Sequence, residues 1–257
     1  MLLLTQFLLR LSLGMAAAMT LVSPRQVTSG YYRNNMYVLL GLNVLAALVA
    51  IQSSGSLVLW PPIVAAVLSY VGAVGWLYGS ARVGMISLAL VAVTCLVGAW
   101  LDLPQAFSVD DPASVLRYAA VPSGGLVLGV TMAAMLLGHW YLNAPGMRIA
   151  PLQRLIAVMM AAIVLRAVVS GVGLAFLIAQ SSEPTVVETL ASHGVWMLAL
   201  RWLTGIVGSL ITAAMAWQTL KIPNTQSATG ILYVGVMFTF LGELTAELLS
   251  TDAVWSL

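Results

Sequence analysis

The apolar positions of this sequence fall into eight long runs that are separated by short polar stretches. A helix that crosses the hydrocarbon core of a bilayer needs about 20 predominantly apolar residues. The runs are close to that length and predict spanning helices at Leu2–Val22, Met36–Gln52, Leu57–Tyr78, Val83–Leu101, Ala120–Leu142, Leu155–Ala179, Gly194–Thr219 and Thr229–Ser250. The expected fold is an all-α polytopic bundle that forms a single integral-membrane domain over residues 1–257.

The first run also resembles a signal peptide, which would be cleaved from the mature protein. It lacks a basic leader, however, and it carries Arg10 in the middle of its apolar stretch. A cleaved signal peptide normally has a basic segment before an uninterrupted apolar core. We therefore interpret the first run as a spanning helix.

Composition supports a membrane location and argues against nucleic-acid binding and cysteine-based sites. Of the 257 residues, 61% are hydrophobic and only 7% are charged, whereas about a quarter of the residues in a soluble domain are charged. The net charge of +2 comes from scattered basic residues and does not favour a nucleic-acid partner. The single cysteine, Cys95, excludes an intrachain disulfide and a CxxC-type site. The expected surroundings are a lipid bilayer and other protein subunits.

The loop charges predict how the bundle is oriented. Loops taken alternately put Arg25, Arg33, Arg82, Arg148, Arg154 and Lys221 on one side of the membrane. The other side holds Asp102, Asp110, Asp111, Glu183, Glu188 and Asp252, with Arg117 as its only basic residue. Basic loops stay in the cytoplasm, so both termini and the loops at residues 102–119 and 180–193 are expected outside. This pattern suggests the inner membrane of a bacterium, with the termini in the periplasm.

Charged residues inside the spans are the candidate functional groups, because a charge in hydrocarbon usually faces other helices or a polar cavity. At a helical rise of about 1.5 Å per residue, Arg166 should lie about 20 Å from the outer boundary, Glu243 and Arg10 about 12 Å, and Arg201 about 10 Å. Small and hydroxyl residues recur at helical spacing beside Arg166, Arg201 and Glu243. These faces are therefore expected to pack against other helices.

Two interpretations of these charges are open. In the structural one, Arg201 and Glu243 form a buried ion pair that fixes helix register, and Arg166 bonds backbone carbonyls. In the functional one, the outer half of the bundle holds a polar pocket in which arginines outnumber glutamates. Such a pocket suits an electron-rich oxygen ligand such as a quinone carbonyl, a lipid phosphate or a carboxylate. The candidate ligand-binding residues are Arg166, Arg201, Glu243, Glu247, His193 and Arg10.

The remaining polar residues suggest no cofactor held by this chain alone. His139 is expected at the inner end of the fifth span and His193 at the outer end of the seventh, about 30 Å apart, so the two cannot ligate one haem iron. No metal-ligand or nucleophile motif is present in the sequence. Asn43, in the middle of the second span, is expected to form a hydrogen bond to another helix.

The predicted topology resembles that of the polytopic membrane anchors of the DMSO-reductase and polysulfide-reductase type. The likeness lies in eight spans, external termini and polar residues in the outer half, and no shared motif identifies site residues. It implies a membrane subunit of an electron-transfer complex that acts as an anchor and offers a quinone site. The alternatives are a small transporter, for which Pro61, Pro62 and residues 123–125 would be helix interruptions, and an assembly protein without a ligand.

Overall fold

Helices account for every regular element in the part of the chain that the structure describes. The computed structural model describes residues 2–53, 56–103, 107–144, 146–179, 195–222 and 224–252. The elements are α1 (Leu2–Thr20), α2 (Ser29–Ser53), α3 (Ser56–Leu77), α4 (Ala81–Leu101), α5 (Pro112–Asn143), α6 (Ala150–Ala179), η1 (Leu203–Gly208), α8 (Ser209–Thr219) and α9 (Thr225–Asp252). The seventh span runs from Val195 to Thr219 and includes η1 and α8.

The prediction of eight spanning helices is confirmed, because eight described segments are long and apolar enough to cross a membrane. The largest differences from the predicted starts are at the second and fifth spans, which begin earlier than expected. The second starts at Ser29, where Tyr31 and Tyr32 are buried and donate their hydroxyls to the carbonyls of Ala133 and Val22. Aromatic side chains with satisfied hydroxyls continue the helix beyond its apolar run.

The fifth span starts at Pro112, so residues 112–119 are helical and not part of a loop. The Asp111 carboxylate caps this helix by accepting hydrogen bonds from the backbone N–H groups of Ala113 and Ser114. Proline is well tolerated at the first helical position, since its missing N–H would have no partner there. The polar segment was expected to be a turn because its cap was not recognised.

The interruptions that would have favoured a transporter are absent from these helices. α3 continues through Pro61 and Pro62, and α5 continues through Pro122 and residues 123–125. Pro122 deprives the carbonyl of Tyr118 of its helical donor. The indole N–H of Trp100 on α4 donates to that carbonyl at 3.1 Å, so the helix keeps its backbone satisfied.

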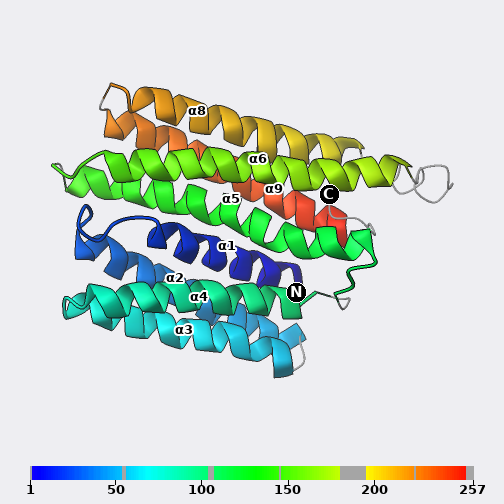
Figure 1. Cartoon of the computed structure of the whole chain (residues 1–257), viewed down its shortest axis with the longest axis horizontal. Coiled ribbons are helices and arrows are strands. Elements are labelled where there is room, and N and C mark those ends of the chain that lie inside the picture. The colour runs from blue at the N-terminus through cyan, green and yellow to red at the C-terminus, as the bar shows by residue number, and fades with distance from the viewer. Residues whose placement is uncertain are drawn as a thin grey trace.

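The eight spans form two four-helix groups (Figure 1). In the first group, α1 and α3 each pack against α2 and α4; in the second, α5, α6, the seventh span and α9 repeat this arrangement. Gly98 of α4 lies against Pro61 of α3, and Gly242 of α9 lies against Gly205 of η1. In the sequence, Gly242 follows Gly98 by the same number of residues as Gly205 follows Pro61. The two groups therefore share a packing plan.

The groups meet along α1 and α5, which are the central helices of the bundle. In each, 78% of the apolar window is buried, against 33% to 44% in the other six spans. A Cβ at Gly14 would overlap the backbone of Gly125, and a Cβ at Gly129 would overlap the backbone of Gly14. Glycine at these positions lets the two backbones touch.

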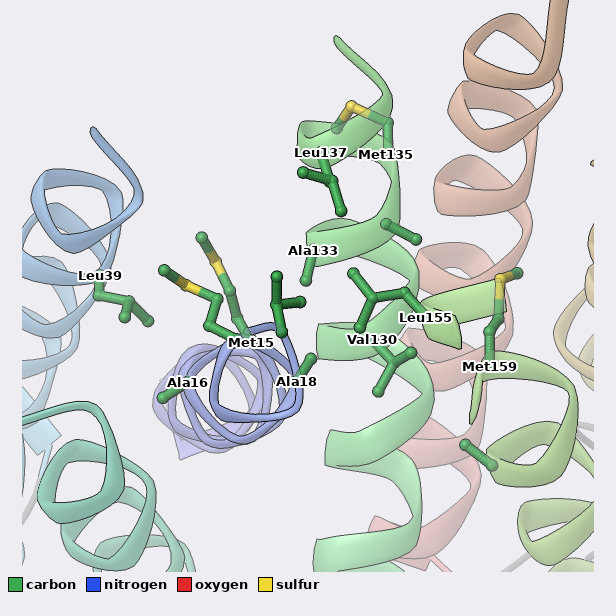
Figure 2. Close-up of a cluster of buried hydrophobic side chains, with 14 of the residues drawn as sticks. Met15, Ala16, Ala18, Leu39, Val130, Ala133, Met135, Leu137, Leu155 and Met159 are labelled. Atoms are coloured by element: carbon green, nitrogen blue, oxygen red, sulfur yellow. The ribbon is translucent and has the colours of Figure 1, made fainter. Parts of the chain in front are cut away.

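The apolar core extends through both groups. Figure 2 shows Met15 of α1 lying between Leu39 of α2 and Val130 of α5, and all three side chains are buried. The start of α1 and the end of α9 lie at one end of the bundle (Figure 1), which we call the terminus end. α4 ends there and α5 begins there.

Candidate functional site

Three charged side chains from three helices meet in the second group. Arg166 of α6 donates from Nε to Oε1 of Glu243 and from Nη2 to Oε2, both at 3.0 Å. Arg201, just before η1, places Nη2 at 3.3 Å from Oε1 of Glu243 and donates to Ser170 Oγ at 2.9 Å. We call Arg166, Ser170, Arg201 and Glu243 the inner cluster.

Glycines make room for the inner cluster on the neighbouring helices. A Cβ at Gly124 of α5 would lie 2.5 Å from Oε2 of Glu243, and one at Gly205 of η1 would lie 2.5 Å from Nη1 of Arg201. Gly205 also packs against the backbone of Gly242 on α9. The ion-paired groups thus occupy space that any larger residue at these positions would fill.

The inner cluster has more donors than acceptors. Arg166 and Arg201 carry two formal positive charges against one negative charge on Glu243. Within the described residues, Nη1 of Arg166 and both Nε and Nη1 of Arg201 are buried and have no hydrogen-bond partner. An unsatisfied buried donor is costly, so this arrangement is suited to an added oxygen acceptor.

The seventh span changes its helical form beside the cluster. η1 is a π-helix that begins two residues after Arg201. Just after η1, the hydroxyl of Ser209 donates a hydrogen bond to the carbonyl of Thr204 at 3.0 Å. Such π segments inside α-helices are rare and often lie at functional sites. The irregular part of this span therefore adjoins the excess positive charge.

A second group of polar side chains lies nearer the terminus end, where α1, α4 and α9 meet. Arg10 of α1 lies with Nη1 3.3 Å from Oε1 of Glu247 and donates from Nε to Oε1 of Gln6 at 3.3 Å. Gln6 donates to the carbonyl of Ala99, one turn before Asp102 at the end of α4. We call Gln6, Arg10, Asp102 and Glu247 the outer cluster.

The outer cluster has more acceptors than donors. Both carboxylate oxygens of Asp102 and both of Glu247 are buried and accept no hydrogen bond from the described part of the chain. Arg10 provides one positive charge against their two formal negative charges. Burial raises the pKa of Asp102 to about 6, although the nearby Gln6 and Arg10 oppose that shift.

The predicted site residues are partly brought together as expected. The Arg201–Glu243 ion pair is confirmed. The predicted bonding of Arg166 to backbone carbonyls is wrong, since its guanidinium pairs with Glu243 in a two-point contact. Glu247 joins Arg10 in the outer cluster. His193 lies outside the described residues.

Sequence reasoning missed Asp102 and Gln6. Asp102 was assigned to an external loop, yet only 9% of its surface is exposed. Counting it gives three arginines and three carboxylates in the two clusters, so the predicted excess of arginine holds only for the inner one. The signal for Gln6 was its position four residues before Arg10, which puts both on one helix face.

Two other polar residues singled out from the sequence, Asn43 and His139, contact neighbouring helices. Asn43 accepts a hydrogen bond from the Cys95 thiol of α4 at 3.3 Å, which confirms the predicted interhelical bond. His139 contacts the Tyr233 hydroxyl at 3.4 Å on an exposed surface. Among the described residues, no group of three or more His, Cys, Asp or Glu side chains is arranged to hold a metal ion.

Comparison with known proteins adds no relative: no family model, curated protein or solved structure matches the chain.

Proposed function

We propose that this chain is an integral membrane subunit of an electron-transfer complex, and that its inner cluster binds a quinone or a similar electron-rich oxygen ligand. The observation that carries the proposal is the set of three buried nitrogens on Arg166 and Arg201 that have no hydrogen-bond partner among the residues the structure describes. A quinone carbonyl is a hydrogen-bond acceptor that gains negative charge on reduction. Guanidinium donors bind such oxygens strongly because the bond is charge-assisted.

The surroundings of the cluster suit a lipid-soluble ligand. Large apolar side chains are exposed on the outer faces of the bundle, including Val164 and Val168 on α6 and Leu203 and Val207 on η1. Such faces contact lipid tails in a bilayer. A quinone dissolved in the membrane would meet α6 and η1 before it reached the arginines.

The proposed placement follows the loop charges. The terminus end would face the periplasm of a bacterial inner membrane, because most basic residues lie at the opposite end. Partner subunits would supply the redox centres.

The experiment is a titration of the purified protein with a short-chain ubiquinone analogue, in which binding is measured by the quenching of tryptophan fluorescence. Arg201→Gln removes the excess charge and leaves the Arg166–Glu243 pair in place, so the fold is expected to persist. Loss of a hydrogen bond to a charged group costs about 1.5–3 kcal/mol, which predicts affinity about 10 to 100 times weaker. Arg33→Gln, at the opposite end, is the matched control and should not change affinity. Absence of binding to the wild type, or equal affinity in the two variants, would reject the proposal.

A second candidate is a transporter of a small anion, and the position of η1 favours it. Broken or irregular helices beside charged residues form many transporter sites. Uptake of a small anion by liposomes containing the protein, abolished by Arg201→Gln and unaffected by Arg33→Gln, would move the assignment to this class.

A further inference from the structure

The two clusters have complementary deficits along one path through the bundle. Among the described residues, three buried nitrogens of the inner cluster donate no hydrogen bond, and four buried carboxylate oxygens of the outer cluster accept none. The ionic contact of 3.3 Å from Arg10 reaches one oxygen of Glu247. The formal charges of the two clusters are +1 and −1. A ligand with acceptor oxygens would satisfy the three nitrogens of the inner cluster, and a proton would neutralise one carboxylate of the outer cluster.

The carboxylates become more deeply buried along this path. The exposed fraction falls from 9% for Asp102 to 4% for Glu247 and 1% for Glu243. Asp102 follows the last residue of α4, and α4 ends at the terminus end. Glu243 and Glu247 are four residues apart and so lie one turn apart on the same face of α9. The outer cluster therefore lies between the terminus end of the bundle and the inner cluster.

We propose that Asp102 and Glu247, with Arg10 beside them, bind one proton from solution at the terminus end, and that this proton is bound together with the ligand of the inner cluster. The proton converts one carboxylate to a carboxylic acid, and no bond in the ligand forms or breaks. The coupling rests on the proposed function, whereas the proton site does not.

The chemistry of the outer cluster favours a proton as the missing group. A buried carboxylate that accepts no hydrogen bond is costly while it is ionised. A proton removes the charge and turns one of its oxygens into a hydrogen-bond donor. The raised pKa of Asp102, about 6, places its titration within reach of ordinary solution pH. The charged groups that act on these two acids are Arg10 on α1, Glu243 on α9 and Arg166 on α6.

The coupling follows from the spacing on α9. The carbonyl oxygen of a quinone carries partial negative charge, which increases on reduction, so an oxygen bound to the arginines adds repulsion to Glu243 and, one turn away, to Glu247. Binding of a proton in the outer cluster reduces that repulsion. Ligand and proton should therefore strengthen each other's binding, and by thermodynamic linkage the effect is reciprocal.

The first test is infrared difference spectroscopy of the full chain in lipid, without ligand, as pH is lowered from about 8 to about 5. The expected result is a carboxylic-acid band that appears near pH 6 and is diminished by Asp102→Asn and by Glu247→Gln. Asp110→Asn, at an exposed position in the same loop, is the control and should keep the band. Both test variants mimic the protonated form and should remain folded, which thermal unfolding checks. A band that survives in both test variants, or no band in the wild type, would overturn the proton site.

The second test measures affinity for the short-chain ubiquinone analogue at several pH values. In the wild type, affinity should weaken as pH rises through the titration range, by up to about tenfold per pH unit for one coupled proton. Glu247→Gln should flatten this dependence. Arg201-dependent binding with no pH dependence would overturn the coupling and leave the proposed function intact. If the carboxylic-acid band appears as pH is lowered but the protein binds no quinone, the proton site stands and the proposed function is rejected.

Discussion

Replacing Glu243 with glutamine tests whether the inner cluster is held together as an ion-paired unit. The substitution keeps the size of the side chain and removes the charge that balances Arg166 and Arg201. It weakens two hydrogen bonds of 3.0 Å and one ionic contact of 3.3 Å. Breaking a buried ion pair by removing one partner costs about 3–5 kcal/mol, and we expect a loss of stability in that range.

Glu247→Gln is the matched control, since it makes the same change one turn along α9. Glu247 has a single ionic contact of 3.3 Å to Arg10 and accepts no hydrogen bond from the described residues. Its replacement should cost about 1 kcal/mol or less. Reversible unfolding of the detergent-solubilised protein in increasing dodecyl sulfate measures both values, and ligand affinity should follow the same order. Equal effects of the two substitutions would refute the reasoning.

A double-mutant cycle isolates the pair itself. Arg166→Gln and Glu243→Gln should each destabilise the protein, and the double variant should be less unstable than their sum. For directly bonded buried groups the coupling energy is expected to be about 2–3 kcal/mol. A coupling below about 0.5 kcal/mol would mean that the two-point contact contributes little.

Three further predictions concern packing. Gly124→Ala should displace the Glu243 carboxylate and cost about 1–3 kcal/mol by overpacking, measured by the same unfolding assay. Gly129→Ala should cost more, since its Cβ would overlap the backbone of α1 and backbone cannot turn aside; a neutral effect would contradict the close contact. Cys95→Ala should cost about 1–3 kcal/mol by leaving the Asn43 oxygen without its thiol donor, and Cys95→Ser, which restores a donor, should recover most of the loss.

The number and identity of the spans could be predicted because apolar length alone specifies a membrane helix. The starts of α2 and α5 could not, since each begins with polar or aromatic residues whose partners are distant in sequence. Tyr31 is satisfied by the Ala133 carbonyl, a contact that no local pattern reveals. The packing plan shared by the two four-helix groups was not predicted, because the sequence match is sparse: Gly98 and Gly242 are both glycine, but their partners Pro61 and Gly205 differ.

The candidate site was predicted as a set of residues more successfully than as a set of contacts. Depth along each helix correctly paired Arg201 with Glu243. It separated Arg166 from Glu243 because depth was counted from the end of each helix, and α6 extends farther than α9 at the terminus end (Figure 1). Asp102 was assigned to solvent because a polar residue after an apolar run usually ends the span. Its burial depends on α1, which brings Gln6 and Arg10 beside it.

The most direct test of the central claim is native mass spectrometry of the protein gently extracted from its own membrane, with small molecules identified in the same sample. We expect redox subunits and a bound quinone to accompany the wild-type chain, and we expect Arg201→Gln to lose the quinone but keep the subunits. A lone chain or homo-oligomer that carries no quinone would contradict the claim.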